Sequence, residues 1–280
     1  MADVQNIEAS MSYAETTALF IAKERALETA REDALFKDPY AEHLGGMCGQ
    51  NLSDKVKSHA EAFGFGDWTG FHEQWTAVRT AYIDNWLNKA IEAHGDNASS
   101  LQVVNLGAGV CTRPYRLQSL GKVAAVFQVD LEAMTNFRKK VLATIDGLTA
   151  IPQTIHDLVC DLSTDALPGV LEEAGFRRDK PTLWVLEGLV MYLAKDRQIA
   201  LLKQLGELSC AGSGAVVNYM ADDGTGRNPA AHPVDELTQL FKESSWSSVN
   251  TLMFGEEELD FGRYKASKPN PSFSFAELSQ

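Results

Sequence analysis

Residues 103–117 read "VVNLGAGVCTRPYRL", a short apolar run that leads into two glycines, Gly107 and Gly109. Because glycine has no side chain, the backbone N–H groups of such a loop can come close to a ligand. In doubly wound α/β proteins, ligands bind at the carboxyl ends of the strands, near the point where the strand order reverses. Glycines after a strand also form ordinary tight turns, so this loop alone does not identify a site.

Short apolar runs alternate with helical patterns from residue 101 onward. The expected strands cover residues 101–107, 123–130, 181–187 and 214–220, and the expected helices cover 132–145, 163–175 and 195–209. This alternation is typical of a parallel sheet. A further helical pattern at 234–246 precedes two runs, 251–255 and 272–278, that indicate late antiparallel strands. The sequence thus predicts a doubly wound, mostly parallel α/β fold.

Two helical segments precede this region. Residues 14–36 are rich in Ala, Glu and Leu, and residues 72–94 carry one broad apolar stripe, so both segments are predicted to be helices. The glycine-rich residues 45–70 between them show little periodicity, and we expect an irregular segment that closes as a mobile lid. The expected division is a helical cap with a lid at 1–98 and one compact, ligand-binding α/β core at 99–280.

The composition excludes several classes of function. Of the 280 residues, 38 are acidic and 25 are basic, and the formal net charge of −13 argues against a nucleic-acid partner. No apolar stretch is long enough to span a membrane, and the first residues lack the pattern of a secretory signal. The four cysteines and six histidines are scattered without metal-ligand spacing. We therefore expect a reduced, cytoplasmic protein without a metal site.

The end of the next expected strand carries a second signal, Asp130. A carboxylate there can accept hydrogen bonds from ribose hydroxyls, or it can cap the following helix. A dinucleotide loop reads GxGxxG, whereas "GAGVCT" has Thr112 in place of the third glycine. A ligand without a pyrophosphate does not need that close approach. The loop therefore favours an adenosine-type ligand, with S-adenosylmethionine as the candidate cofactor.

Several blocks of the chain, in order, resemble the leucine carboxyl methyltransferases and their bacterial and secondary-metabolism relatives. These blocks are "AKERALETAREDALFKDPYAEHL", "VRTAYID", "NLGAGVCTRPYRL", "VDLE", "CDLS" and "LEGLVMYL". The family consists of class I S-adenosylmethionine-dependent methyltransferases, so the resemblance implies their Rossmann-like fold with a seven-stranded sheet. One position departs from the family's GAGxDTRxxRL loop, because Cys111 stands where the family has Asp. The carboxylate that the family has at this position could cap the following helix or contact Arg113.

Carried over position by position, the resemblance implies a cofactor site. Its residues are Arg25 and Arg79 near the methionine carboxylate, Gly107 and Gly109 in the loop, Asp130 at the ribose with Leu131 beside it, Asp161 and Leu162 at the adenine, and Glu187 toward the methionine amino group. Tyr192, in the last block, is expected to border the acceptor. The residues alone leave simpler alternatives open. Arg79 could pair with Asp84 or Glu73, and Asp161 could cap a helix.

Methyl transfer from a sulfonium is an in-line displacement that depends on alignment and exclusion of water. A carboxylate acceptor needs no base, whereas a hydroxyl acceptor does. His72 and His156 are the histidines considered for that role, and His72 and Tyr192 are the candidate catalytic residues. We expect O-methylation of a carboxyl or hydroxyl group on a small secondary-metabolism acceptor. The alternatives are carboxyl methylation of a protein C-terminus, an NAD(P)-dependent oxidoreductase, and a cofactor binder without turnover.

Overall fold

The computed structural model describes residues 11–62, 68–164, 166–221, 239–241, 243–244, 246–263 and 270–280. Most of the helix expected at 234–246 lies outside the described residues, as do residues 63–67 of the expected lid.

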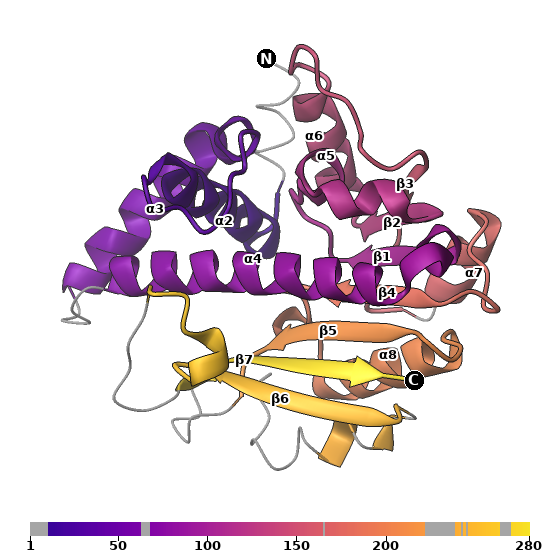
Figure 1. Ribbon diagram of the computed structural model, residues 1–280. Coiled ribbons are helices and arrows are strands. Elements are labelled where there is room, and N and C mark those ends of the chain that lie inside the picture. Colours follow the sequence, from indigo (N-terminus) through magenta and orange to yellow (C-terminus); the bar gives the residue numbers. More distant parts are fainter. Residues whose placement is uncertain are drawn as a thin grey trace.

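In the described part of the chain, seven strands form one sheet (Figure 1). They are β1 (Gln102–Leu106), β2 (Ala125–Asp130), β3 (Ile155–Val159), β4 (Thr182–Leu186), β5 (Gly214–Tyr219), β6 (Ser248–Phe254) and β7 (Asn270–Ser279). Their order is β3-β2-β1-β4-β5-β7-β6, and β7 runs antiparallel to both of its neighbours, β5 and β6. The predicted α/β sheet, mostly parallel with two late antiparallel pairings, is confirmed.

One strand, β3, had no counterpart among the runs predicted from the sequence. Its segment "IHDLV" places His156 and Asp157 between apolar residues, and all five positions are at least partly exposed. Because β3 lies at the edge of the sheet, it does not need the continuous apolar run that marks the buried strands.

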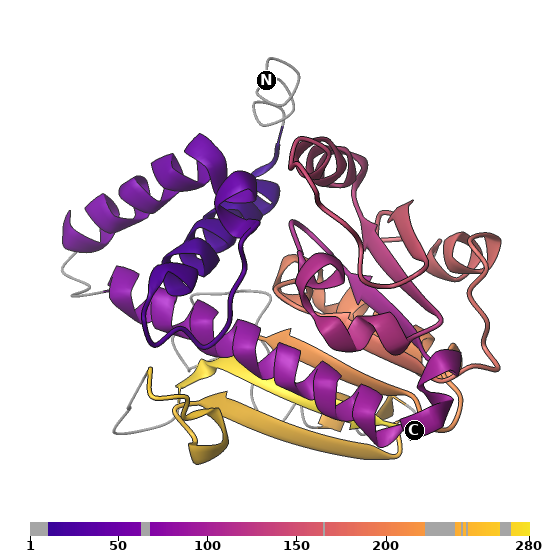
Figure 2. The same cartoon turned by 45° about the horizontal axis from the view of Figure 1, so that its top comes forward.

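Helices cover both faces of the sheet (Figures 1 and 2). They are α2 (Tyr13–Ala30), α3 (Ala41–Ala62), α4 (Trp68–Ala93), α5 (Arg113–Arg116), α6 (Glu132–Leu142), α7 (Leu167–Glu173) and α8 (Lys195–Glu207). Short 3₁₀ helices lie at η1 (Gly95–Ser100), η2 (Gln118–Lys122), η3 (Val190–Tyr192) and η4 (Glu257–Leu259). None of the helices in the described ranges combines the length and the apolar character that crossing a bilayer requires.

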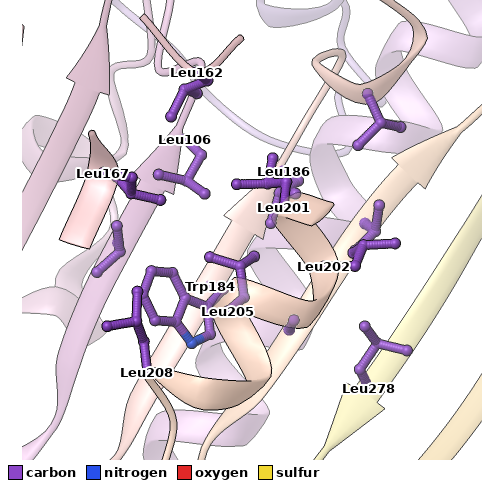
Figure 3. Close-up of a cluster of buried hydrophobic side chains, with 14 of the residues drawn as sticks. Leu106, Leu162, Leu167, Trp184, Leu186, Leu201, Leu202, Leu205, Leu208 and Leu278 are labelled. Carbon is purple, nitrogen blue, oxygen red and sulfur yellow. The ribbon is translucent and has the colours of Figure 1, made fainter. Parts of the chain in front are cut away.

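Alternating strand residues divide the core into two layers. Val104 and Trp184 face α7 and α8 in a leucine-rich cluster (Figure 3). The neighbouring residues Val103 and Leu183 point to the opposite face, where Trp75 and other residues of α4 cover them. This period-two alternation is what a sheet buried on both sides requires.

The first described helix, α2, is shorter than predicted. It begins at the N-cap Ser12, which forms a capping box with Glu15, and it ends at Ala30 rather than at residue 36. Beyond that point Lys37 donates from Nζ to the carbonyls of Thr29 and Arg31 at 2.7 and 3.0 Å. These contacts satisfy the terminal carbonyls and fold the chain back, which ends the helix despite a favourable composition.

The irregular structure expected over residues 45–70 is wrong for the part that the structure describes, since α3 extends to Ala62. Gly46, with φ of 51° and ψ of −155°, kinks this helix. Gly49 lies against α2 so closely that a Cβ atom there would be 2.5 Å from the carbonyl oxygen of Leu19. The glycines therefore permit close packing of two helices, a role that composition alone does not reveal.

Candidate functional site

A cavity of about 590 Å³ opens at the carboxyl ends of β1 and β4. The strand order reverses between these two strands, which is where ligands bind in open α/β sheets. Residues of α2 and α4, two helices that precede β1 in the chain, also line the cavity. Every site residue predicted from the sequence lines it: Arg25, His72, Arg79, Gly107, Gly109, Asp130, Leu131, Asp161, Leu162, Glu187 and Tyr192.

The loop after β1 has the close-approach geometry expected from its glycines. Gly107 and Gly109 have φ angles of 64° and 52°, which side chains rarely tolerate. A Cβ atom on Gly107 would lie 2.9 Å from Cδ1 of Leu189, so a side chain would also collide with the loop after β4. The backbone therefore forms this wall of the cavity.

Asp130, the last residue of β2, is fixed by this loop. Its Oδ2 accepts from the backbone N–H of Gly109 at 2.5 Å, and its Oδ1 accepts from that of Leu131 at 2.7 Å. Burial raises the pKa of this carboxyl, while the two backbone hydrogen bonds act in the opposite direction. The alternative role as a helix cap is wrong, because α6 has no side-chain cap.

Asp161 follows β3 and lies at the exposed edge of the cavity. Its Oδ1 accepts from the backbone N–H of Ser163 at 2.9 Å, and hydrogen bonding to Ser163 lowers the pKa of the carboxyl. Because α7 begins only at Leu167, Asp161 shapes a turn and does not cap that helix. Leu162 is buried beside it, whereas Leu131, which also lines the cavity, is 42% exposed.

Arg79 and Glu187 are paired with each other. Arg79 donates from Nε to Oε1 of Glu187 at 2.9 Å, and Arg113 donates from Nη1 to Oε2 at 2.6 Å. Burial would raise the pKa of Glu187, but the charges of Arg113 and Arg79 outweigh it and lower the pKa to about 2. The site thus presents an ionised carboxylate and a guanidinium side by side.

This pair belongs to a buried ion-pair network. Its members are the cations Arg25, Arg79, Arg113 and Arg116 and the anions Asp38, Asp84 and Glu187. Four positive and three negative groups leave one net positive charge. Asp84 accepts from Arg113 and Arg116, so the ion pair between Arg79 and Asp84 considered from the sequence is wrong.

Arg25 is largely committed to this network. It donates from Nε to Oδ2 of Asp38 at 2.9 Å and from Nη2 to the carbonyl of Val110 at 2.9 Å. It therefore braces α2 against the glycine loop. Its expected contact with a methionine carboxylate stays a prediction.

The two candidate catalytic residues lie at different parts of the cavity. His72, on α4, has its Nδ1 2.9 Å from both carboxylate oxygens of Glu24. Tyr192, on η3, is 50% exposed, and its hydroxyl lies 2.9 Å from Oγ1 of Thr17 on α2. His156 does not line the cavity, because its ring stacks on Phe127 at 4.7 Å.

The position that departs from the family's loop also lines the cavity. Arg113 donates from Nη1 to Sγ of Cys111 at 3.7 Å, a weak contact beside its strong one to Glu187. Asp84 supplies the second anionic partner of Arg113. The loop therefore keeps its arginine in place although Cys111 brings no charge.

Several residues at the cavity were not predicted as site residues from the sequence. Trp75 and Phe273 line the cavity, while Glu24 contacts the lining residue His72 and accepts from Thr76. Their partners are distant in the chain, so no local pattern indicates a role in the site. Among the described residues, no three His, Cys, Asp or Glu side chains gather in a way that could hold a metal ion.

The groups that line the cavity fit a nucleoside bearing an amino acid. The glycine loop leaves a cradle that a Cβ atom would fill, and Asp130 presents a fixed acceptor next to it. Arg79 and Glu187 offer a cation and an anion to the two charges of a zwitterion.

Comparisons with known proteins identify the family. The model of the leucine carboxyl methyltransferase family matches residues 18–206. A protein of Rhodococcus jostii, described as an expected S-adenosyl-L-methionine-dependent methyltransferase, is 35% identical over 247 residues, which cover 87% of this chain and 78% of that protein. A protein of Streptomyces coelicolor with the same description is 33% identical over 203 residues, and this match covers 70% of this chain but only 63% of the relative.

Solved structures with the same fold are much more distant in sequence. A DUF574 family protein of Streptomyces avermitilis has a TM-score of 0.53 at 12% identity, covering 92% of this chain and 96% of that one. A protein of Thermobifida fusca, described as an expected methyltransferase, has a TM-score of 0.54 at 15% identity, covering 86% and 92%. The fold and the family match agree, and the chain belongs to the leucine carboxyl methyltransferase family of S-adenosyl-L-methionine-dependent methyltransferases.

Proposed function

We propose that the chain transfers the methyl group of S-adenosyl-L-methionine to an oxygen atom of a small-molecule acceptor. When bound, the cofactor supplies a methyl group activated by a sulfonium. In this proposal the chain holds it with Arg25, Arg79, Gly107, Gly109, Asp130, Leu131, Asp161, Leu162 and Glu187. These residues orient the reacting groups and exclude water, which is the main task of an enzyme that catalyses a displacement.

The observation that carries the proposal is the meeting of two features at one point of the sheet. Asp130 is locked to the glycine loop after β1, and the Arg79–Glu187 pair lies at the end of β4. The first feature suits a ribose and the second suits a zwitterionic amino acid. A dinucleotide would offer no amino acid to the second feature, so this pairing favours the methyl donor over NAD(P).

The size and lining of the cavity support a small acceptor. Its volume of about 590 Å³ is in the range of small-molecule pockets. Beyond Arg79, the cavity is lined by the rings of Phe20, His72, Trp75 and Phe273, which we call the aromatic end. An acceptor with an apolar body would bind there with its oxygen toward the cofactor, bordered by Tyr192.

Calorimetric titration with S-adenosylhomocysteine tests the cofactor site. Wild type is expected to bind S-adenosylhomocysteine. Asp130→Ala should bind it roughly 10- to 100-fold more weakly, because the two hydrogen bonds that the ribose hydroxyls would donate to the carboxylate are lost. Asp146→Ala is the matched control, since Asp146 is exposed and does not line the cavity. Equal affinities in all three proteins, or tighter binding of NADH, would refute the assignment.

The atom that receives the methyl group can be identified from the product. Methyl esters release methanol in mild base, whereas methyl ethers do not, so alkaline treatment separates carboxyl from hydroxyl acceptors. Transfer to nitrogen, sulfur or carbon would contradict O-methylation while leaving the cofactor site intact.

A further inference from the structure

The aromatic end of the cavity surrounds an imidazole on several sides. The ring centroid of His72 lies 5.3 Å from that of Phe20 and 6.4 Å from that of Phe273. Trp75 packs against Phe273 at 5.1 Å. An apolar acceptor placed among these rings would therefore have His72 as its titratable neighbour.

A buried carboxylate holds this imidazole in one orientation. Glu24, on α2, is 2% exposed, and both of its oxygens lie 2.9 Å from Nδ1 of His72. Thr76 donates from Oγ1 to Oε2 of Glu24 at 2.5 Å. Because a carboxylate accepts and does not donate, Nδ1 must carry the proton. In the neutral ring, the lone pair is then on Nε2.

The arrangement along α4 separates two electrostatic environments. His72 and Arg79 are seven residues apart, which places them on the same side of the helix and about 10 Å apart along its axis. Arg79 belongs to the network with a net positive charge, whereas His72 is held by an anion. The charge of Glu24 would repel a carboxylate acceptor near His72, whereas it would not repel a neutral hydroxyl.

We propose that Glu24 is a positioning residue that holds His72 as the general base for a neutral hydroxyl acceptor. This inference rests on the proposed function and narrows its acceptor from carboxyl or hydroxyl to hydroxyl. The acceptor's proton moves to Nε2 of His72 while its oxygen bonds to the methyl carbon. The carbon–sulfur bond breaks with its electron pair on sulfur, and His72 then releases the proton to solvent.

The tautomer of His72 is measured by nitrogen NMR on protein labelled with ¹⁵N-histidine, with its resonances assigned through His72→Gln. We expect the Nδ1–H form in wild type and a mixture of tautomers in Glu24→Gln. Thr76→Val, a milder change, should weaken the preference without removing it. His43→Gln is the matched control, since His43 is exposed and outside the cavity. A wild-type Nε2–H form would overturn the proposal.

A matched pair of probes then tests the acceptor class on protein saturated with S-adenosylhomocysteine. We expect 4-phenylphenol to shift the Nε2 resonance of His72, and biphenyl-4-carboxylate, which has the same apolar body, to leave it unchanged. A merely structural histidine would respond to neither probe, and that result would overturn the proposal. A shift with the acid alone would overturn it as well.

Turnover measurements separate an effect of Glu24 on catalysis from an effect on cofactor binding. With S-adenosylmethionine and 4-phenylphenol, Glu24→Gln should lower kcat about 100-fold or more while KM for the cofactor stays the same. Methylation of the acid at a rate unaffected by His72→Gln would refute the inference but not the proposed function. Failure of S-adenosylhomocysteine to bind would instead refute the proposed function, while the tautomer of the unliganded protein would still report on the pair.

Discussion

Replacing Glu187 with Gln should reveal how strongly the site depends on one ionised carboxylate. Glu187 accepts from Arg79 and Arg113, and its side chain is 15% exposed. Burial opposes ionisation, but the two cations lower the pKa of the carboxyl from 4.5 to about 2. A shift of that size corresponds to about 3 kcal/mol of folding stability at neutral pH.

The sign of the effect sets its pH dependence. Because the pKa of Glu187 is lower in the folded state, its stabilising contribution is complete above the unfolded value of 4.5 and is lost as the pH falls toward 2. A Gln side chain cannot ionise. The difference in unfolding free energy between wild type and Glu187→Gln should therefore shrink from about 3 kcal/mol at neutral pH to roughly half of that near pH 3.

Urea denaturation at a series of pH values measures this difference. The control is Glu172→Gln, whose partner Arg178 lies on the surface, with side-chain exposures of 44% and 52%. That variant should stay within about 0.5 kcal/mol of wild type near neutral pH, because exposed pairs contribute little. A loss for Glu187→Gln that does not change between neutral pH and about pH 3 would refute an ionised pair.

Four other substitutions test the scaffold. Gly107→Ala and Gly147→Ala both place a side chain at positive φ, but only the alanine at 107 would contact another residue, Leu189, at 2.9 Å. Calorimetry should show weaker S-adenosylhomocysteine binding for Gly107→Ala alone. Denaturation should show a loss of about 1–2 kcal/mol in both variants. Leu201→Ala, in the fully buried cluster below β4, should cost about 2–5 kcal/mol by the same measurement. Arg263→Ala removes two hydrogen bonds to the buried Glu28, which keeps its contacts with Arg31 and Leu35, and should lower stability by about 2–3 kcal/mol. A loss below about 1 kcal/mol would show that the pair is solvated.

Local patterns in the sequence predicted the parts of the fold that depend on local physics. The apolar run before Gly107 is β1, and the acid that ends the next strand is within hydrogen-bonding distance of the loop. Both follow from strand periodicity and from the rule that parallel strands end at the same edge. The division at residue 98 stays a prediction, because α4 packs on the sheet as well as against α2.

The misassigned segments depended on contacts between distant residues. The six glycines of residues 45–70 lower the helix propensity of this segment, yet α3 forms because its glycines lie against the backbone of α2. The end of α2 is set by side chains that arrive after a turn, and β3 is an edge strand without a full apolar run. In each case packing outweighs the propensity of the segment itself.

The partners within the site follow the same logic, but helix geometry could have excluded one of them in advance. Arg79 and Asp84 are five positions apart on α4, so they point about 140° apart around the helix and cannot meet easily. Because of this angle, Arg79 contacts Glu187, which lies 108 residues away in the chain, whereas Asp84 accepts from Arg113. His72 lies seven residues before Arg79 and therefore shares its face, where Glu24 of another helix meets it. The sequence thus contains the direction of each side chain on α4, whereas the identity of its partner requires the fold.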